Sequence, residues 1–331
     1  MKILVTGASG FLGSHIVEEL TKQGLPLKAA YRPGETFNGD GSDVMIDGLD
    51  LESFPLDITN RNAVYQAVQG CQMLFHSDFL CSFSGKDKAR LEAINHLGTK
   101  NVMEAALHHG VEKVVYTSGM ETLAPAPGRE QVDESDGVSL DDLKTEFERS
   151  RFLAEREVTR LKQQGLPVII VHPTVCLGTR DRIPTSLFGS YLLRYLRKKT
   201  HFYIDTGINL VDVVDVAKGH LLAAKRGQVG ARYILGNQNV YMLELLRNLQ
   251  KITGVKAPAT ALPLALAKTG NLLARTLLFK KDGVPNAVLN RLKQPLFFNP
   301  SLARNELGLP QSNVWEALRR HVIYLKNLHQ I

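Results

Sequence analysis

Three glycines near the start of the chain have the spacing of a phosphate-binding loop. The segment TGASGFLGSHI (6–16) lies between an apolar strand pattern and a helical pattern. The first glycine permits a tight turn, the second lets the backbone approach a pyrophosphate, and the third lets the helix pack closely on the strand. The helix start offers N–H groups and partial positive charge to phosphate. We therefore expect a dinucleotide here, bound by Gly7, Ser9, Gly10, Phe11, Leu12 and Gly13.

Residues after the second and third strand patterns bear on which dinucleotide binds. The second pattern ends in Ala-Tyr-Arg-Pro (30–33), where an NAD-binding fold commonly has an acid for the ribose 2′-hydroxyl. Arg32 can instead pair with a 2′-phosphate, or it is a solvated surface arginine. Asp57 and Ile58 are placed to reach the adenine edge, although Asp57 can equally cap a turn. These residues predict NADP(H), with NAD(H) as the less favoured alternative.

Several polar side chains that follow strand patterns could transfer protons. Asp78 comes directly after Ser77, and Glu121 comes shortly after Ser118. A carboxylate beside a reacting atom can act as a general acid or base. Glu121 is alternatively a surface or salt-bridged residue. Asp78 either faces a substrate or weakens the binding of an anionic dinucleotide.

The segment EFERSRFLAE (146–155) raises a different question. Phe147 and Arg151 lie four residues apart, so they share one face of a helix. Phenylalanine has no proton to give, and arginine is always charged. The segment is either a plain amphipathic helix or an active-site helix that has lost its proton donor.

Alternating strand and helix patterns must position these residues. Short apolar runs separated by helices of ten or more residues indicate βαβ units and a parallel sheet. After about residue 180 helical patterns dominate. The sequence predicts an α/β fold, a Rossmann-type doubly wound parallel sheet, in residues 1–180, with part of 205–235 returning to the sheet. Residues 181–331 should form a smaller, mostly helical C-terminal substrate lobe.

Composition limits the partners. The 331 residues are 44% hydrophobic and 22% charged, which is ordinary for a globular protein. The net charge of +7 would suit an anionic cofactor, an acidic membrane surface or nucleic acid. No basic module with interleaved aromatics is present, so we expect no nucleic acid. The three cysteines lack metal-ligand spacing, and their odd number argues against a disulfide framework, so we expect no metal site.

Membrane signals are weak in this sequence. It has no run of about 18 apolar residues and no leader pattern at its start, so we expect a cytoplasmic protein without a transmembrane segment. The segment LPLALAKTGNLLARTLLFKK (262–281) is amphipathic with a basic end. It could contact a membrane surface peripherally, or it is a lid helix over the substrate pocket.

Nine segments together resemble a known family. They are TGASGFLG (6–13), LDIT (56–59), LFH (74–76), INHLGTKNVMEAA (94–106), VVYTSG (114–119), RSRFLAERE (149–157), VIIVHPTVCLGTRD (168–181), DTGINLVDVVDVAKGHLLA (205–223) and RYILGNQN (232–239). The chain resembles an extended short-chain dehydrogenase/reductase of the NAD-dependent epimerase/dehydratase type. The nearest subgroup is that of the dihydroflavonol-reductase-like proteins, which include hopanoid-associated sugar epimerases.

The resemblance implies a Ser-Tyr-Lys mechanism. In the family, a serine and a tyrosine bind the substrate oxygen, the tyrosine relays a proton, and a lysine four residues later binds the nicotinamide ribose. A hydride then moves to or from NAD(P). In this chain the tyrosine position is Phe147, the lysine position is Arg151 and the serine position is Gly119, with Ser118 beside it. The resemblance therefore implies a catalytic helix without its acid/base.

The resemblance also implies roles for neighbouring residues. Ser77 lies where the family backbone approaches the cofactor, and His172 and Thr174 follow a strand that runs past the nicotinamide. Arg151 would keep a cofactor contact. Glu121 matches a glutamate that removes a proton from carbon in related dehydratases. In many relatives two helices pair across a two-fold axis, so we expect a homodimer.

Three functions stay open at this point. We favour an atypical NADP(H)-binding enzyme whose site has diverged, with acid–base, elimination, isomerisation or altered redox chemistry on a small or lipophilic substrate. The candidates for its catalytic residues are Glu121, Ser118, Arg151 and Asp78. The second possibility is a dinucleotide-binding pseudoenzyme that serves as a sensor or scaffold. The third is a reductase or epimerase with a non-standard proton donor.

Overall fold

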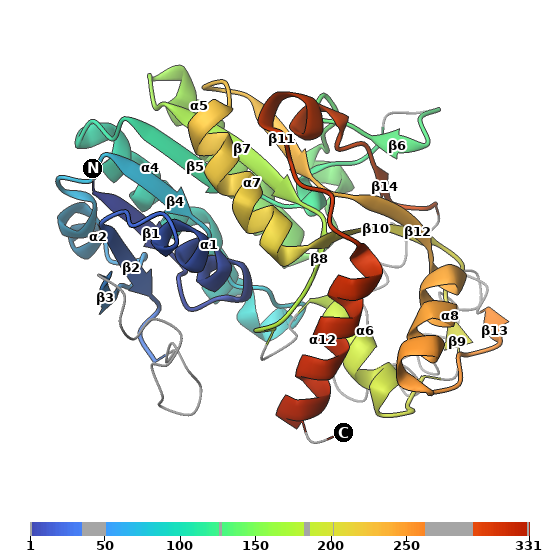
Figure 1. Ribbon diagram of the computed structural model, residues 1–331. Coiled ribbons are helices and arrows are strands. Elements are labelled where there is room, and N and C mark those ends of the chain that lie inside the picture. The colour runs from blue at the N-terminus through green and yellow to red at the C-terminus, as the bar shows by residue number, and fades with distance from the viewer. Residues whose placement is uncertain are drawn as a thin grey trace.

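The structure, a computed structural model, consists of a large α/β sandwich and a smaller lobe (Figure 1). It describes residues 2–34, 51–125, 128–181, 186–200, 202–261, 294–329 and 331. The amphipathic segment 262–281, considered above as a lid or membrane contact, lies outside the described residues.

A seven-stranded parallel sheet forms the centre of the larger part. Its order is β11-β7-β5-β4-β1-β2-β3. The strands are β1 (Ile3–Thr6), β2 (Leu27–Tyr31), β3 (Leu51–Pro55), β4 (Met73–His76), β5 (Lys113–Thr117), β7 (Val168–Pro173) and β11 (Arg232–Leu235). The order reverses between β1 and β4, and at such a point open α/β sheets bind ligands. The predicted Rossmann-type fold is confirmed.

Helices cover both faces of this sheet. The helices α1 (Phe11–Thr21) and α7 (Val213–Arg226) pack on one face. The other face carries α2 (Arg61–Val68), α4 (Thr99–His108) and α5 (Glu146–Gln163). Because both faces are covered, the central strands are mostly apolar on both sides instead of alternating apolar with polar residues, and their buried polar residues lie toward their carboxyl ends.

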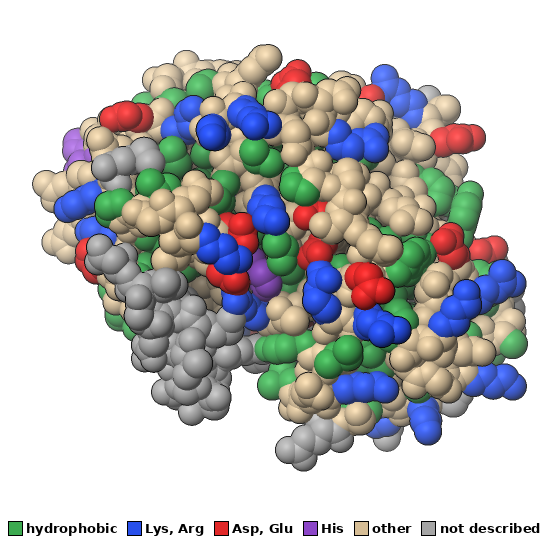
Figure 2. Space-filling model, in the orientation of Figure 1, with side chains coloured by type: hydrophobic (Ala, Val, Ile, Leu, Met, Phe, Trp, Pro, Cys, Tyr) green, Lys and Arg blue, Asp and Glu red, His purple; other side chains and the backbone are tan. Residues whose placement is uncertain are grey.

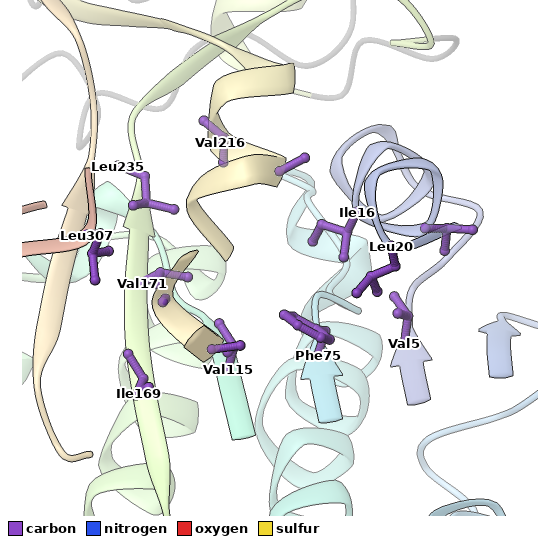
Figure 3. Close-up of a cluster of buried hydrophobic side chains, with 14 of the residues drawn as sticks. Val5, Ile16, Leu20, Phe75, Val115, Ile169, Val171, Val216, Leu235 and Leu307 are labelled. Atoms are coloured by element: carbon purple, nitrogen blue, oxygen red, sulfur yellow. The ribbon is translucent and has the colours of Figure 1, made fainter. Parts of the chain in front are cut away.

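The core divides into one cluster on each side of the sheet. Ile3 and Val5 point to the α1 side, and Leu4 points to the opposite side. On α1, Ile16 and Leu20 lie one turn apart and face the sheet, as Figure 3 shows. All five side chains are at most 2% exposed. Burying each of them stabilises the fold by roughly 1.5–3 kcal/mol.

The helical stretch before α4 is irregular. It begins as α3 (Lys88–Leu91), continues as a π-helix, η2 (Glu92–Gly98), and then becomes α4. Such wide turns are rare and often occur at functional sites. Here the π-helix carries Asn95, whose amide bonds both backbone groups of Leu80, accepting at 2.7 Å and donating at 2.9 Å. The irregular turn thus positions the segment that follows β4.

The smaller lobe contains more β-structure than the sequence predicts. A three-stranded sheet of order β12-β10-β8 supports it. The elements are β8 (Val175–Leu177), α6 (Leu187–Leu196), β9 (Phe202–Tyr203), β10 (Gly207–Asp212), β12 (Gln238–Tyr241), α8 (Met242–Thr253), β13 (Thr260–Ala261), β14 (Phe297–Phe298) and α12 (Val314–His329). After β10 the chain returns to the large sheet, as expected for part of 205–235: α7 packs on one face of that sheet, and β11 is its edge strand. The exact division into domains stays a prediction.

Basic side chains gather on the smaller lobe. Figure 2 shows many Lys and Arg side chains over the part of the surface where α6 and α8 lie. At the end of α6, Arg197, Lys198 and Lys199 are all exposed. These residues account for part of the chain's positive charge.

Candidate functional site

The glycine loop has the backbone geometry that phosphate binding requires. Gly7 has a φ of +72°, and a Cβ atom on it would lie 2.7 Å from the Cα of Asp78. A Cβ on Gly13 would collide with the carbonyl oxygen of Gly7. The N-cap of α1 is Gly10, which has no side chain to bond the first N–H groups of the helix. Those donors and the helix dipole suit a pyrophosphate.

Three further residues predicted to bind the cofactor, Ser77, Asp57 and Ile58, have contacts within the protein. Ser77 is fixed to β1, since its N–H and its hydroxyl both donate to the Thr6 carbonyl, at 3.2 and 2.9 Å. Asp57 accepts from the backbone and hydroxyl of Thr59 at 2.9 and 2.8 Å, which is a turn contact. Ile58 is buried in the core on the α4 side of the sheet.

Arg32 and Asp78 form an ion pair in the same region. The Arg32 Nη2 atom lies 2.6 Å from Asp78 Oδ1, and the side chains are only 19% and 5% exposed. Arg32 follows β2 and Asp78 follows β4, and β1 lies between these two strands. The sequence suggested both residues, but it did not predict that they bond each other.

Helix α5 presents Phe147 and Arg151 toward the segment after β4. A capping box fixes its start, in which Thr145 and Glu148 bond each other's backbone N–H groups. The Phe147 ring, 7% exposed, contacts Phe83 with ring centroids 5.3 Å apart. Phe147 is thus part of an aromatic cluster at the position where the resemblance places a tyrosine.

Arg151 is fully buried and makes several contacts. Its Nε donates to Glu121 Oε1 at 3.0 Å and its Nη2 to the Thr117 carbonyl at 2.7 Å. The guanidinium lies over the Phe79 ring at 4.4 Å from the ring centroid, and 5.8 Å from that of Tyr116. Such cation–π contacts add to the hydrogen bonds. Arg151, at the position where the resemblance places a lysine, therefore bonds groups of the protein itself.

Glu121 occupies the space that a side chain at position 119 would take. A Cβ atom built on Gly119 would lie 2.5 Å from Glu121 Oε1 and 2.6 Å from its Cδ. Glu121 lies in the short helix η3 (Met120–Thr122), and its side chain is 16% exposed. A carboxylate fixed by Arg151 therefore stands where the resemblance places the serine hydroxyl.

Ser118 points instead into a second, buried polar network. Its hydroxyl donates to Glu155 Oε2 at 2.5 Å, and Arg232 Nη2 bonds the other oxygen at 3.0 Å. Burial raises the pKa of Glu155, but His172, Arg232 and hydrogen bonds, including that from Ser118, outweigh it and lower the pKa below its ordinary value. This carboxylate is ionised at neutral pH.

His172 belongs to the same network. Arg232 Nε donates to His172 Nε2 at 3.3 Å, so the proton of the neutral ring is assigned to Nδ1, which donates to the Gly119 carbonyl at 3.2 Å. Burial lowers the pKa of His172. Sequence reasoning placed His172 near a cofactor and missed Glu155 and Arg232. The spacing of four between Arg151 and Glu155 was the available signal.

Two further polar residues near the carboxyl ends of the strands, His76 and Thr174, have partners within the protein. The His76 ring lies between the hydroxyls of Thr6 and Thr99, at 2.6 and 3.0 Å, and burial lowers its pKa to about 3. Thr174 donates to Asn209 Oδ1 at 2.8 Å. The bond from Thr174, which follows β7, to Asn209 in β10 links the two sheets, and whether Thr174 also contacts a cofactor stays a prediction.

The two ends of the site fit a nicotinamide dinucleotide differently. The glycine loop and the start of α1 offer the cradle and the donors that a pyrophosphate needs. At the other end Phe147 offers no hydroxyl and Arg151 is bonded to Glu121.

Within the described ranges there is no group of three His, Cys, Asp or Glu residues that could bind a metal ion. Nor does any helix in those ranges have the length and apolarity to cross a membrane.

Comparison with known proteins decides the family. The sequence model of the NAD dependent epimerase/dehydratase family matches residues 3–236. The chain belongs to this family. A putative dihydroflavonol 4-reductase from Synechocystis is 34% identical over 98% of this chain and 94% of its own length. Sterol demethylase protein B from Methylococcus capsulatus is 30% identical over 80% of this chain and 78% of its own length.

Solved structures share the fold of this chain. The crystal structure of gox2253 superposes with a TM-score of 0.84 at 32% identity, and the match covers 98% of each chain. A nucleoside-diphosphate-sugar epimerase from Pseudomonas aeruginosa superposes with a TM-score of 0.78 at 21% identity, covering 99% of this chain and 98% of that one. The second likeness shows the fold alone.

Proposed function

We propose that this family member binds NADP(H) and transfers a proton through Glu121 on a small or lipophilic substrate. One observation carries the proposal: the Glu121 carboxylate lies in the space of the side chain missing at Gly119 and bonds Arg151. The family's serine and lysine positions are thus replaced by a carboxylate–guanidinium pair. Phe147 cannot act as the proton donor.

The cofactor would be bound mainly through its phosphates. The glycine loop from Gly7 to Gly13 and the start of α1 would bind the pyrophosphate, and Arg32 would face a 2′-phosphate. When bound, the nicotinamide supplies hydride transfer. We expect titration calorimetry to show tighter binding of NADP⁺ than of NAD⁺. An NAD⁺ preference would contradict the role of Arg32.

Glu121 has the properties of a positioned general base. The hydrogen bond from Arg151 fixes the direction of its carboxylate, and the 16% exposure of its side chain leaves it within reach of a ligand. A positioned base accelerates proton transfer by typically about 10²–10⁴-fold. The neighbouring Ser118 is bonded to Glu155, so we assign it to the support of the site.

An apolar substrate fits the surroundings of this carboxylate. Phe147 contacts both Phe79 and Phe83, with ring centroids 6.4 and 5.3 Å apart. The names of two relatives concern lipophilic molecules: the sterol demethylase protein, and a farnesyl-quinoline ketoreductase from Stigmatella aurantiaca, 27% identical over 93% of this chain. They support the proposed substrate class.

Hydrogen–deuterium exchange tests the base directly. Enolisable ketones, including a steroid 3-ketone, are incubated with the protein and NADP⁺ in D₂O and followed by proton NMR. We expect exchange above the buffer rate, and a loss of about 10²-fold or more in Glu121→Gln. Glu157→Gln is the matched control, because Glu157 pairs with Arg160 on the same helix α5 as Arg151. Exchange that persists in Glu121→Gln would contradict the proposal.

The burial of Arg151 favours a second candidate function. At 1% exposure, with its charge bonded to Glu121 and Thr117, Arg151 is directed at the protein itself. A pseudoenzyme that only binds a dinucleotide would need Arg151 for the stability of the fold and not for contact with a substrate. Native mass spectrometry that finds a bound dinucleotide, together with no ketone exchange and no cofactor turnover, would support this function over the first.

We also propose that the protein forms a homodimer through α5 and the helical stretch that begins near Ala89 and comprises α3, η2 and α4. These helices lie side by side on one face of the sheet, and the resemblance to the family implies that they pair across a two-fold axis. Light scattering at micromolar concentration should give twice the mass of the chain. A monomer mass would refute the proposal.

A further inference from the structure

An ion pair spans the carboxyl end of β1. Arg32 follows β2, Asp78 follows β4, and β1 lies between those strands. Their side chains nevertheless meet, with Arg32 Nη2 2.6 Å from Asp78 Oδ1. The pair is largely buried, at 19% and 5% exposure. A charged hydrogen bond of this kind is stronger than a neutral one.

The position of Asp78 is fixed by backbone contacts. Gly7 approaches it so closely that a Cβ there would lie 2.7 Å from both the N and the Cα of Asp78. Ser77 is bonded to β1, and Asn95 bonds both backbone groups of Leu80. The Asp78 backbone cannot shift far without breaking these contacts. The carboxylate therefore stays beside the first glycine of the phosphate-binding loop.

We propose that Asp78 is a specificity-determining residue that competes with the 2′-phosphate of NADP(H) for the guanidinium of Arg32. The inference rests on the dinucleotide binding proposed above. A 2′-phosphate is an anion, so it must share or displace Asp78 at Arg32. The 2′-hydroxyl of NAD(H) carries no charge and makes no such demand. The choice between the two cofactors is then set by the pair and not by Arg32 alone.

The ion pair reduces the preference of the protein for NADP(H) over NAD(H). Arg32 alone would favour NADP(H) by the strength of a guanidinium–phosphate contact. With Asp78 in place, part of the free energy gained from the contact between Arg32 and the 2′-phosphate is lost, because the phosphate weakens the ion pair between Arg32 and Asp78. The carboxylate cannot move away, since its backbone is fixed. The negative charge of Asp78 also repels the pyrophosphate, but this effect acts equally on both cofactors. Removing the charge should therefore help NADP(H) more than NAD(H).

Titration calorimetry of Asp78→Asn with NADP⁺ and NAD⁺, at fixed ionic strength, tests this competition. Asparagine keeps the shape and an acceptor oxygen but removes the charge. We expect the affinity for NADP⁺ to rise by about tenfold, which corresponds to about 1.4 kcal/mol. The affinity for NAD⁺ should rise by no more than about threefold. Asp78→Ala, which removes the acceptor as well, should change the ratio in the same direction.

Two further variants distinguish competition for Arg32 from a general effect of negative charge on cofactor affinity. Glu52→Gln removes one negative charge from β3, where Glu52 pairs with Lys28 at 3.7 Å, and should leave the ratio of affinities unchanged. In an Arg32→Ala background no guanidinium is left to compete for, and only the direct repulsion between the carboxylate and the cofactor phosphates remains. Asp78→Asn should therefore shift the ratio of the affinities for NADP⁺ and NAD⁺ by less than it does in the wild type.

The outcomes are distinct. If Asp78→Asn shifts the ratio of affinities as much in the Arg32→Ala background as in the wild type, or shifts it in neither, the competition is overturned, while dinucleotide binding stands. The same holds if Asp78→Asn weakens NADP⁺ binding. If neither the wild type nor any variant binds either cofactor, the proposed function itself fails, and the inference fails with it.

Discussion

Replacing Arg151 with methionine should destabilise the protein by about 3–5 kcal/mol, the range for breaking a buried ion pair from one side. Methionine fills much of the same volume without the charge. The change leaves two acceptors without their donor, namely Glu121 Oε1 at 3.0 Å and the Thr117 carbonyl at 2.7 Å. It also removes the guanidinium from the face of Phe79.

The magnitude follows from these contacts. Each hydrogen bond from a charged donor contributes about 1.5–3 kcal/mol, and the cation–π contact about 1 kcal/mol. Their sum is reduced because the Glu121 side chain is 16% exposed and can be partly rehydrated. Adding Glu121→Leu should recover part of the loss, since the carboxylate that has lost the charge of Arg151 is then gone. We expect a coupling of about 1–2 kcal/mol between the two sites.

Urea denaturation of the four proteins in this cycle measures the coupling. The chain has a single tryptophan, Trp315 in α12, so its fluorescence reports on the smaller lobe, and circular dichroism reports on the whole. Coincident transitions are required before a free energy of unfolding is assigned. A loss below about 1 kcal/mol in Arg151→Met, or costs that simply add, would refute the reasoning that Arg151 and Glu121 act as a pair.

Three further predictions concern two glycines and a pair of buried histidines. Gly119→Ser should cost about 1–3 kcal/mol, measured by urea denaturation, because its Cβ meets the carboxylate of Glu121; an unchanged midpoint would contradict this. Gly13→Ala should abolish dinucleotide binding in calorimetry, since the added methyl group collides with a backbone carbonyl, and retained affinity would count against the loop. Burial lowers the pKa of His76 to about 3 and of His220 to about 4, below the unfolded value of 6.5. The unfolded chain therefore binds more protons below that value, and thermal unfolding should show stability falling by about 1.4 kcal/mol per pH unit for each histidine between pH 6.5 and about 4. A flat stability curve over that range would refute the assignment.

The fold could be predicted because its signals are local. Each βαβ unit has its strand, its helix and its glycine or capping residues within one short segment, as in the stretch from β1 to α1. The short strands of the smaller lobe were not predictable in this way. Several have two to four residues, such as β9 and β12, and they gain their stability from partners distant in the chain.

The sequence allowed us to predict which residues lie at the candidate site, but not which residues they contact. The register of α5 placed Phe147 and Arg151 on one face, and the structure has them on the inward face of that helix. The partners of these residues depend on side-chain directions that no local pattern encodes. Glu121 reaches Arg151 across 30 residues, and Arg32 reaches Asp78 across 46. The same reason explains why the bond between Glu155 and Arg232, 77 residues apart, was missed.

The overlap between Gly119 and the Glu121 carboxylate constrains any route back to a serine-containing site. A serine at 119 has no room until the side chain at 121 is shortened or turned away, and turning it away means breaking its bond to Arg151. The changes must therefore come in one order, first at 121 and then at 119, and the reverse order passes through a strained intermediate. Directed evolution that permits one substitution per round should meet a barrier at Gly119 that libraries varying both positions together avoid.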